Sequence, residues 1–435
     1  MEEVVKVGLL GAGTVGGGVI KVLEKNGEDI AKKAGEKIKI AKIFGLAKDM
    51  STYQKEYGDA YAYTDKVEDI LDDPEIKIVV ELIGREHPAK EFIAQALAKG
   101  KSVVTANKDV VAKYGKELFP IAEEHGCDLL FEASVAGGIP IISPLKTSLA
   151  ANEILSVMGI VNGTTNYMLT KMTRDGVDYN EVLKEAQTKG YAESDPTADV
   201  GGLDAARKIV ILASIAFNTR LSLDDVSIEG IQNISIRDIQ FAKELGYTIK
   251  LLAVAKRDKE HGISLAVHPT MLPNDHPLAN VNDVYNAIFV VGDAVGDTMF
   301  MGMGAGRFPT ASAVCSDIIE AARNLKHHDG GRISCTCFNE KQMCPKEQMY
   351  APCYIRMNVT DESGALSAIA AAFASQKVSL RNVVQKDLPN GNAEIVVITH
   401  RVSEMNLQMA LSLLKVLPVV DKICSVIRVE DKDMN

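Results

Sequence analysis

The 435-residue sequence contains no tryptophan and no long uninterrupted run of apolar residues. Its apolar stretches, such as residues 209–217, are much shorter than the roughly 20 residues that cross a bilayer, so we expect no membrane span. It also lacks any block of five or more Lys and Arg, and its formal net charge is −10, so a nucleic-acid partner is not expected. The first residues, including Glu2 and Glu3, do not form the basic segment of a secretory signal.

Cysteine is sparse, odd in number and scattered, which argues against a disulfide framework and suits a reducing cytoplasm. Four of the seven cysteines lie in a polar, aperiodic stretch, at Cys335, Cys337, Cys344 and Cys353. Their spacing is not usual for zinc, so we interpret them as thiols of an unstructured linker. With 46% hydrophobic and 24% charged residues, the composition is typical of a globular protein of two or three domains.

The first part of the chain alternates buried strands with helices. Strands are expected at 4–10, 38–44, 78–83, 102–105 and 128–133, and helices at 19–25, 88–99 and 110–125. Repeated β-α-β units favour a parallel, doubly wound sheet of the Rossmann type. We therefore expect an α/β domain over residues 1–139, completed by an amphipathic helix at 310–325.

The rest of the chain does not show this regular alternation of strands and helices. Residues 140–309 mix helices, beginning with one at 140–149, with strand-like runs and predict an α+β catalytic and dimerisation domain. Residues 326–350 are expected to be a linker between separate cores. The order β-α-β-β-α-β follows over 354–429, the ferredoxin-like arrangement, and predicts a third domain at 351–431.

A glycine-rich turn joins the first strand to the first helix. Gly11 permits the tight turn, Gly13 lets the backbone approach a pyrophosphate, and Gly16 allows close packing of helix on strand. This context predicts a dinucleotide site. No acidic residue ends the second strand; Lys48 stands there instead and favours a 2′-phosphate, as in NADPH, or is simply a solvated side chain.

The densest polar cluster runs from Gly190 to Lys208. Asp204 and Lys208 are four residues apart on an expected helix whose later part is apolar, so Lys208 is a candidate for proton transfer. Glu193 and Asp199 precede that helix on an expected loop and could hold a substrate ammonium. The alternative is an exposed helix start with an ordinary ion pair.

Three further positions suit ligands. Thr164 begins a helix after a strand and could cradle a carboxylate or merely cap the helix. Thr105 and Lys108 follow the fourth strand, at the edge where parallel sheets bind ligands. Glu132 follows the fifth strand, where a carboxylate and turn carbonyls could hold a hard cation.

Together these residues give the chain a resemblance to homoserine dehydrogenase, in its longer bacterial form with a C-terminal ACT domain. The similarity rests on segments 7–16, 102–108, 131–140, 161–167, 190–208 and 304–312, of which the stretch Gly190–Lys208 is the most specific. It implies the NAD(P)H-dependent reduction of L-aspartate 4-semialdehyde to L-homoserine, on the route to threonine and methionine. It also implies a cytoplasmic homodimer or homotetramer.

The resemblance assigns roles to single residues. Lys208 resembles the proton donor, with Glu193, Asp204, Asp199 and Thr164 at the substrate. The positions that resemble cofactor contacts are Gly11, Gly13, Thr14, Val15, Gly16, Lys48, Thr105, Lys108, Gly190 and Gly306. The Glu132 side chain and the carbonyls of Val135, Gly137 and Ile139 resemble a sodium site.

The chain departs from the family pattern after the third strand, where Arg85 could contact a 2′-phosphate, so the preference between NADH and NADPH stays open. The resemblance implies that the C-terminal domain binds threonine, with Asp361 near its ammonium; the alternative is a tether that only dimerises. We expect the domain to be removable from about residue 345 without unfolding the enzyme. Two rivals remain. One is an aldehyde dehydrogenase acting through Cys127 or Cys315, and the other is an amino-acid sensor without catalysis. His268 and His276 are expected in surface loops.

Overall fold

The computed structural model describes residues 4–388 and 391–430, so Glu2, Glu3 and the expected boundary at 431 lie outside the described residues. The chain divides into two compact units. The first contains residues 1–157, 207–224 and 286–341, and the second contains residues 158–206, 225–285 and 342–435. Helix α10 (Leu203–Ala216) begins in the second unit and continues in the first.

A six-stranded parallel sheet forms the centre of the first unit, in the order β3-β2-β1-β4-β5-β6. Its strands are β1 (Val4–Leu10), β2 (Lys37–Phe44), β3 (Ala62–Thr64), β4 (Ile76–Glu81), β5 (Ser102–Thr105) and β6 (Leu129–Leu130). Strands β1, β4 and β5 are almost wholly buried, as continuous apolar runs in a parallel sheet require. The predicted α/β class is confirmed.

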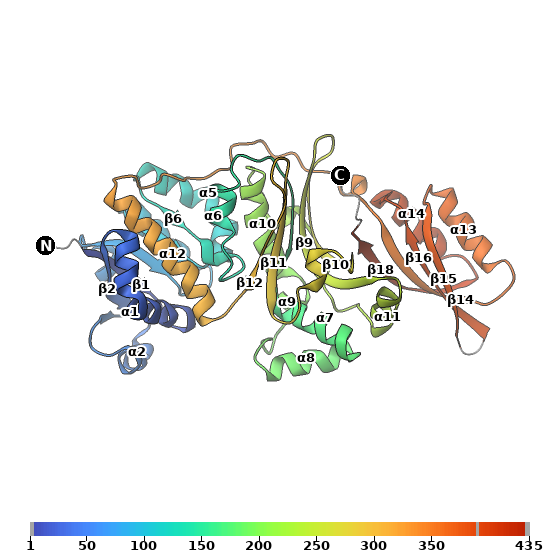
Figure 1. Ribbon diagram of the computed structural model, residues 1–435, viewed down its shortest axis with the longest axis horizontal. Helices are drawn as coiled ribbons and strands as arrows, with labels where there is room; N and C mark the ends of the chain where they lie inside the picture. Colours follow the sequence, from blue (N-terminus) through green and yellow to red (C-terminus); the bar gives the residue numbers. More distant parts are fainter. Residues whose placement is uncertain (1–3, 389–390, 431–435) are drawn as a thin grey trace. The chain divides into compact units, whose positions relative to one another are not determined.

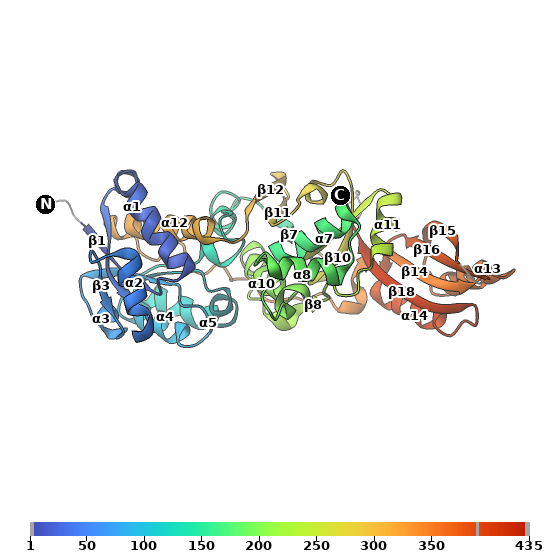
Figure 2. The ribbon, with the colours of Figure 1, turned by 90° about the horizontal axis from the view of Figure 1, so that it is seen from below.

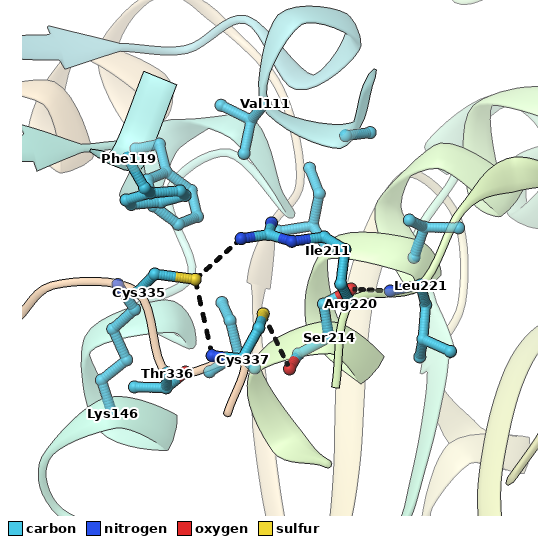
Figure 3. Close-up of a pocket in the computed structure, with 14 residues that line it drawn as sticks. Val111, Phe119, Lys146, Ile211, Ser214, Arg220, Leu221, Cys335, Thr336 and Cys337 are labelled. Atoms are coloured by element: carbon cyan, nitrogen blue, oxygen red, sulfur yellow. Dashed lines mark hydrogen bonds between the residues drawn. The ribbon is translucent and has the colours of Figure 1, made fainter. Parts of the chain in front are cut away.

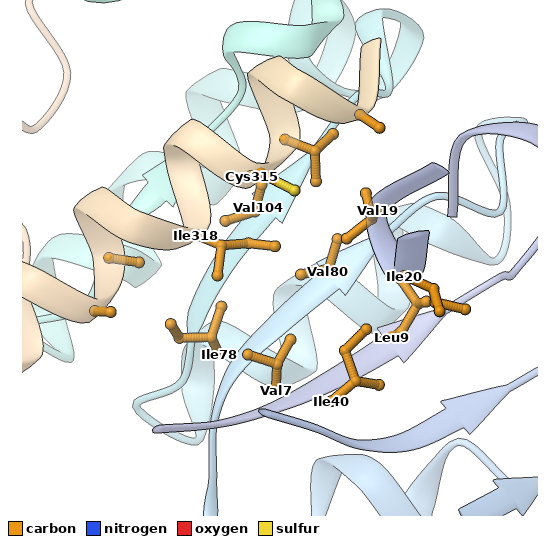
Figure 4. Packing of buried hydrophobic residues seen from close by; sticks show 14 of the residues in the cluster. Val7, Leu9, Val19, Ile20, Ile40, Ile78, Val80, Val104, Cys315 and Ile318 are labelled. Carbon is orange, nitrogen blue, oxygen red and sulfur yellow. The ribbon is translucent and has the colours of Figure 1, made fainter. Parts of the chain in front are cut away.

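Helices cover both faces of this sheet. Helices α1 (Thr14–Ala34) and α12 (Arg307–Lys326) lie on one face, and α4 (Ala89–Ala98) and α5 (Lys108–Glu124) lie on the other (Figure 2). Figure 4 shows Ile318 of α12 packed over Ile78 and Val104 of the strands. Gly18 permits this packing, because a Cβ there would lie 2.6 Å from the Arg307 carbonyl oxygen. The helix expected at 310–325 thus completes the sheet's core.

Several short elements of the first unit differ from the sequence prediction. The strand expected at 128–133 is reduced to β6, and a 3-10 turn, η2 (Glu132–Ser134), follows it. The helix expected at 140–149 is only α6 (Ile142–Lys146). Short elements between β2 and β4 were not predicted: η1 (Ala47–Asp49), α2 (Met50–Tyr57), β3 and α3 (Glu68–Leu71). Over so few residues the hydrophobic periodicity is too weak to predict a helix or a strand.

The second unit begins at residue 158, within β7 (Ile154–Ile160), and contains an antiparallel pair, β9 (Tyr247–Asp258) and β10 (Gly262–Pro273). The chain enters this unit again at the last residue of η3 (Leu223–Asp225). The other elements of the unit before β11 are α7 (Gly163–Asp175), α8 (Tyr179–Thr188), α9 (Thr197–Val200), β8 (Val226–Ile228), α11 (Ile236–Glu244) and η4 (Pro277–Asn280). Asp199 therefore lies in a short helix and not on a loop. His268, expected in a surface loop, lies within β10, and burial lowers its pKa to about 3.

The C-terminal segment has the predicted β-α-β-β-α-β order. It comprises β14 (Cys353–Thr360), α13 (Ala365–Ser375), β15 (Leu380–Leu388), β16 (Asn392–Thr399), α14 (Glu404–Leu414) and β18 (Val420–Val429), with the short pair β13 (Tyr350–Ala351) and β17 (Val402–Ser403) beside them. Strand β18 also pairs in parallel with β10, through Thr270 and Arg428 (Figure 1). The two sheets are continuous at this pairing, while the apolar cluster of the C-terminal segment contains only residues from 353 to 426.

The segment expected to be an unstructured linker is held by specific contacts. In the first unit, the Gly331 N–H donates to Asp128 Oδ1 at 2.9 Å and the Asn339 N–H donates to the Asn218 carbonyl at 2.8 Å. In the second, η5 (Lys346–Gln348) precedes β13.

A hairpin of β11 (Tyr285–Gly292) and β12 (Gly296–Met303) leads into α12. Within the described residues no helix is both long and apolar enough to cross a bilayer.

Candidate active site

The glycine-rich turn has the geometry of a dinucleotide-binding loop. Gly11 has a φ of +93°, and its N–H donates to the Phe44 carbonyl at 2.9 Å. A Cβ on Gly16 would lie 2.1 Å from the Gly11 oxygen, whereas a Cβ on Gly13 would meet nothing within 4 Å. Gly13 therefore faces open space at the start of α1, where Thr14 and Val15 present unpaired N–H groups to an anion.

A group that the sequence did not reveal supports this turn. The Tyr57 hydroxyl of α2 donates to the Ala12 carbonyl at 3.0 Å. Arg307, which follows Gly306 at the start of α12, pairs with Glu56 at 2.8 Å and lies 3.4 Å from the Tyr57 hydroxyl. The turn is thus braced by α2 and α12, which come from opposite ends of the sequence of the first unit.

Two exposed cations lie in loops at the carboxyl edge of the sheet. Lys48 lies in η1, directly after β2, and Arg85 follows β4 with a φ of +65°. Neither side chain makes a hydrogen bond or ion pair with any residue between 4 and 388 or 391 and 430. Both remain available to a phosphate.

The end of β5 is occupied by hydrogen bonds within the protein. The Thr105 hydroxyl donates to the buried carboxylate of Glu81 at 2.7 Å and accepts the Asn107 N–H at 3.0 Å. Asn107 then caps α5, whose first residue is Lys108. Burial raises the pKa of Glu81. Thr105 therefore shapes the loop that carries Lys108, and its hydroxyl is already engaged.

The Glu132 carboxylate caps helix α6. Its Oε1 accepts the N–H groups of Ile141 and Ile142 at 2.6 and 2.8 Å, and its Oε2 accepts that of Ser143 at 2.7 Å. The carboxylate has four lone-pair positions, so one position on Oε2 remains. In the turn that follows η2, among the described residues the carbonyls of Val135, Gly137 and Ile139 accept no hydrogen bond, whereas that of Ala136 accepts the Ile139 N–H.

In the second unit, the Asn162 side chain brings two distant carboxylates together. Its amide donates to Asp199 Oδ1 at 2.7 Å and to Asp204 Oδ2 at 2.9 Å. Its own oxygen caps α7 by accepting the Thr165 N–H at 2.9 Å. The sequence predicted Asp199 and Asp204 as substrate residues, but it gave no sign that the amide of Asn162 joins them.

The remaining predicted substrate residues surround the start of α7. The Thr164 hydroxyl donates to the carbonyl of Tyr191, next to Gly190, which has a φ of +74°. Glu193 lies exposed in the loop between α8 and α9, and its carbonyl accepts the Gln187 side chain at 3.1 Å. The carbonyl, not the carboxylate, of Glu193 anchors this loop.

Lys208 lies one turn after Asp204 in α10, so both side chains project from the same face of that helix. Within the first unit, the neighbouring Arg207 pairs with Asp109 of α5 at 2.8 Å. Asp109 follows Lys108 directly. The ion pair therefore brings the beginning of the α5 helix, with Lys108, beside the turn of α10 that carries Lys208.

The protonation state of Cys127 and Cys315 argues against the aldehyde dehydrogenase alternative. Burial raises the pKa of both Cys127 and Cys315 to about 12, so neither forms the thiolate that an aldehyde dehydrogenase requires. All seven cysteines are free thiols. The buried Lys250 has a pKa lowered by burial to about 8, and its ammonium donates to the Val281 carbonyl at 2.6 Å.

Family models cover most of the chain. The model of the homoserine dehydrogenase NAD-binding domain matches residues 11–132, and the homoserine dehydrogenase model matches residues 140–319. The ACT-domain model matches residues 354–419.

Individual relatives match along nearly their whole length. The homoserine dehydrogenase of Bacillus subtilis is 44% identical over 98% of this chain and 99% of its own. The crystal structure of a homoserine dehydrogenase from Thiobacillus denitrificans, 40% identical, covers 99% of this chain and 100% of its own with a TM-score of 0.93. A hyperthermophilic archaeal homoserine dehydrogenase in complex with NADPH, 26% identical, covers 74% of this chain and 98% of its own with a TM-score of 0.63. The chain therefore belongs to the homoserine dehydrogenase family, whose members are NAD(P)-dependent oxidoreductases that interconvert L-aspartate 4-semialdehyde and L-homoserine.

Proposed function

We propose that Lys208 is the proton donor of this dehydrogenase and that Asp199, Asp204, Glu193 and Thr164 form its substrate site. The observation that carries the proposal is the Asn162 amide, which bonds to Asp199 and Asp204 at 2.7 and 2.9 Å. By donating to both carboxylates, the Asn162 amide holds their two negative charges close together at the start of α10. Such a site suits the ammonium group of an amino-acid substrate.

The chemistry follows from the charge that develops on the substrate. When bound, the nicotinamide cofactor supplies a hydride to the aldehyde carbon. The carbonyl oxygen then gains negative charge, and the Lys208 ammonium stabilises that charge and donates its proton. In the reverse direction the neutral amine of Lys208 accepts the hydroxyl proton of homoserine. Asp204 lies one turn before Lys208 on the same helix face.

For the cofactor we propose contacts by Gly11, Gly13, Thr14, Val15, Gly16, Lys108, Gly190 and Gly306, and a preference for NADPH. The open space at Gly13 and the uncapped start of α1 support the phosphate contacts. The unpaired cations Lys48 and Arg85 support a 2′-phosphate contact. The archaeal relative in complex with NADPH is consistent with that preference. Thr105 acts indirectly, by holding Asn107 and thus the start of α5.

We also propose a monovalent cation at the turn after η2. Na⁺ and K⁺ prefer oxygen ligands, and three carbonyls there, of Val135, Gly137 and Ile139, accept no hydrogen bond from a described residue. Glu132 would add one carboxylate oxygen. The donor set fits a hard cation of single charge, because its one carboxylate is already stabilised by three N–H groups.

For regulation we propose threonine as the ligand of the ACT domain, in a homodimer or homotetramer. Helix α13 begins at Ala365, and its N-cap residue is Gly364, which has a φ of +98° and no side chain to cap the first N–H groups. Asp361, in the loop just before it, receives a bond from Gln385 at 3.2 Å. These groups suit the carboxylate and the ammonium of an amino acid. Domain boundaries at 1–139, 140–309 and 351–431 remain part of the proposal.

The experiment that tests the active-site assignment compares Lys208→Ala with Lys243→Ala, a change at the far end of α11. Loss of one general acid should lower turnover by about 10²–10⁴-fold, while the affinity for NADPH, measured by fluorescence titration, should stay within about twofold. The control should retain full turnover. Near-normal turnover in Lys208→Ala would remove Lys208 from the mechanism.

A further inference from the structure

Cys335 and Cys337 lie together at a small pocket of the first unit. Figure 3 shows their side chains between Arg220, Lys146 and the Ser214 carbonyl. The Arg220 guanidinium donates to Cys335 Sγ, with a nitrogen–sulfur distance of 2.7 Å, and the Cys337 N–H lies 3.4 Å from the same sulfur. The Cys337 thiol donates to the Ser214 carbonyl at 3.7 Å. All these groups belong to one compact unit.

The contacts make the two thiols unequal. The adjacent thiol and the backbone N–H of Cys337, together with the charges of Arg220 and Lys146, lower the pKa of Cys335 despite burial. The adjacent Cys335 sulfur and burial raise the pKa of Cys337. Arg220 and Lys146 are fixed by the Phe119 ring, at 5.6 and 5.4 Å from its centre. An attacking thiolate and a protonated neighbour are thus built into one Cys-x-Cys segment.

The pocket beside Cys335 is small, and Cys335 is partly exposed. Its volume is about 20 Å³, against the 10–15 Å³ or so that one water needs. Hydrogen peroxide, which has two heavy atoms, is small enough to enter it. The described residues also bring no third His, Cys, Asp or Glu to the two thiols, so a metal site is not favoured.

We propose that Cys335 and Cys337 form a peroxide-reactive dithiol, a site of reversible oxidation separate from the dehydrogenase reaction. The Cys335 thiolate attacks one oxygen of hydrogen peroxide, the O–O bond breaks, and the leaving hydroxide becomes water after taking a proton. Cys335 is then a sulfenic acid. The Cys337 sulfur attacks the Cys335 sulfur, the S–O bond breaks, and the departing hydroxide leaves as water with the Cys337 proton. The two thiols lose two electrons and peroxide gains them.

Oxidation changes contacts at α10. A disulfide has no anionic sulfur for Arg220 and no thiol proton for Ser214, so two contacts of the segment are lost. Ser214 and Lys208 belong to the same helix. A dithiol reductant restores both contacts by exchange.

The first test uses the unmodified full-length chain. The reduced protein is treated with an equimolar amount of hydrogen peroxide at neutral pH and digested, and each cysteine peptide is weighed. We expect a loss of about 2 Da in the peptide carrying both Cys335 and Cys337, reversed by dithiothreitol. We also expect Cys335 to react with iodoacetamide on the order of tenfold faster than Cys424, a partly exposed thiol of the second unit, below pH 7.

Variants separate the roles of the two thiols. In Cys337→Ser, peroxide should leave a sulfenic acid at Cys335 that dimedone captures, and in Cys335→Ser neither product should form. Arg220→Gln should slow the oxidation. The proposal is overturned if Cys424 is oxidised or alkylated as fast as Cys335 in the unmodified chain. A disulfide to any other cysteine would overturn it equally.

Discussion

Arg356 of β14 forms a buried ion pair with Asp238 of α11, with 2.7 Å between Nε and Oδ1. The side chain of Asp238 is 0% exposed, and Arg356 also contacts Glu394 at 2.9 Å. Arg356 lies in the ACT segment and Asp238 in the catalytic segment, yet both belong to the second unit. The regulatory segment is thus joined to the rest of its unit by buried charges as well as by the pairing of β18 with β10.

Replacing Arg356 should unfold the protein more easily. Arg356→Met removes the ion-pair partner of the buried Asp238 carboxylate, while Glu394 keeps Arg237 at 2.7 Å, and such a loss costs about 3–5 kcal/mol. Lys386→Met is the matched control, because the pair of Lys386 and Glu244 is partly exposed and contributes at most about 1 kcal/mol. Urea unfolding of both variants checks the difference. Equal midpoints would show that the buried pair adds no stability.

The same carboxylate gives a pH dependence. Burial alone would raise the pKa of Asp238, but hydrogen bonds from Arg356, Ser235 and Ser425 lower it overall. A lowered pKa contributes stability above the unfolded value of about 3.9, and the contribution is lost as the pH falls through the folded value. The difference in unfolding free energy between the wild type and Asp238→Asn should therefore shrink below about pH 4. A constant difference from pH 7 to pH 3 would contradict this.

Deleting the chain from about residue 345 should destabilise the enzyme, contrary to the expectation from the sequence. The deletion removes β18 from the edge of β10 and takes Arg356 away from Asp238. We expect a lower melting temperature and aggregation, because an open strand edge recruits other chains. The threonine response is better tested with Asp361→Ala, which leaves the sheet intact. A truncated enzyme as stable as the full chain would restore the idea of separate cores.

Activity should rise with added Na⁺ or K⁺, and the response should weaken in Glu132→Gln. The amide keeps one acceptor oxygen but loses the charge that attracts the cation and caps α6. Choline chloride at equal ionic strength controls for screening. Equal rates with Na⁺, K⁺ and choline would contradict a cation site at this turn.

Changes at Lys48 and Arg85 should alter the choice of cofactor. If both cations contact a 2′-phosphate, the double change to alanine should raise KM for NADPH by about tenfold, the equivalent of 1.4 kcal/mol, and leave KM for NADH nearly unchanged. Steady-state rates with each cofactor measure this. Lys66→Ala, on a loop before α3, is the control. Equal effects on both cofactors would mean that neither cation reads the phosphate.

The long elements were predictable because their patterns are local. Val4–Leu10 is an almost continuous apolar run and Ser102–Thr105 has two valines at its centre, and both strands have the predicted bounds. The length of helix α6 was overestimated because the helix ends before Thr147, and hydrophobic periodicity does not indicate that end. The linker was misread because its polar residues bond to Asp128 and Asn218, which are more than a hundred positions away.

The candidate site was predictable in its residue types but not in its connections. Carboxylates near Lys208 stand out in the sequence. The Asn162 amide joins Asp199 to Asp204 only because the fold brings it to these residues, which are 37 and 42 positions away in the sequence. Glu132 was expected to serve a cation, and the structure adds its capping of α6. A carboxylate's hydrogen-bond partners come from the tertiary structure, so a motif alone does not supply them.

Helix α12 has a consequence for the order in which the protein is made. The face of the nucleotide sheet that Ile318 covers stays uncovered until residues 307–326 leave the ribosome. At about 5–20 residues per second, the 177 residues between Leu130 and Arg307 take roughly 10–35 s to synthesise. During that time Ile78 and Val104 lack their partner helix. This sheet is therefore completed only when about three quarters of the chain has been made, and until then its uncovered apolar face is exposed to aggregation.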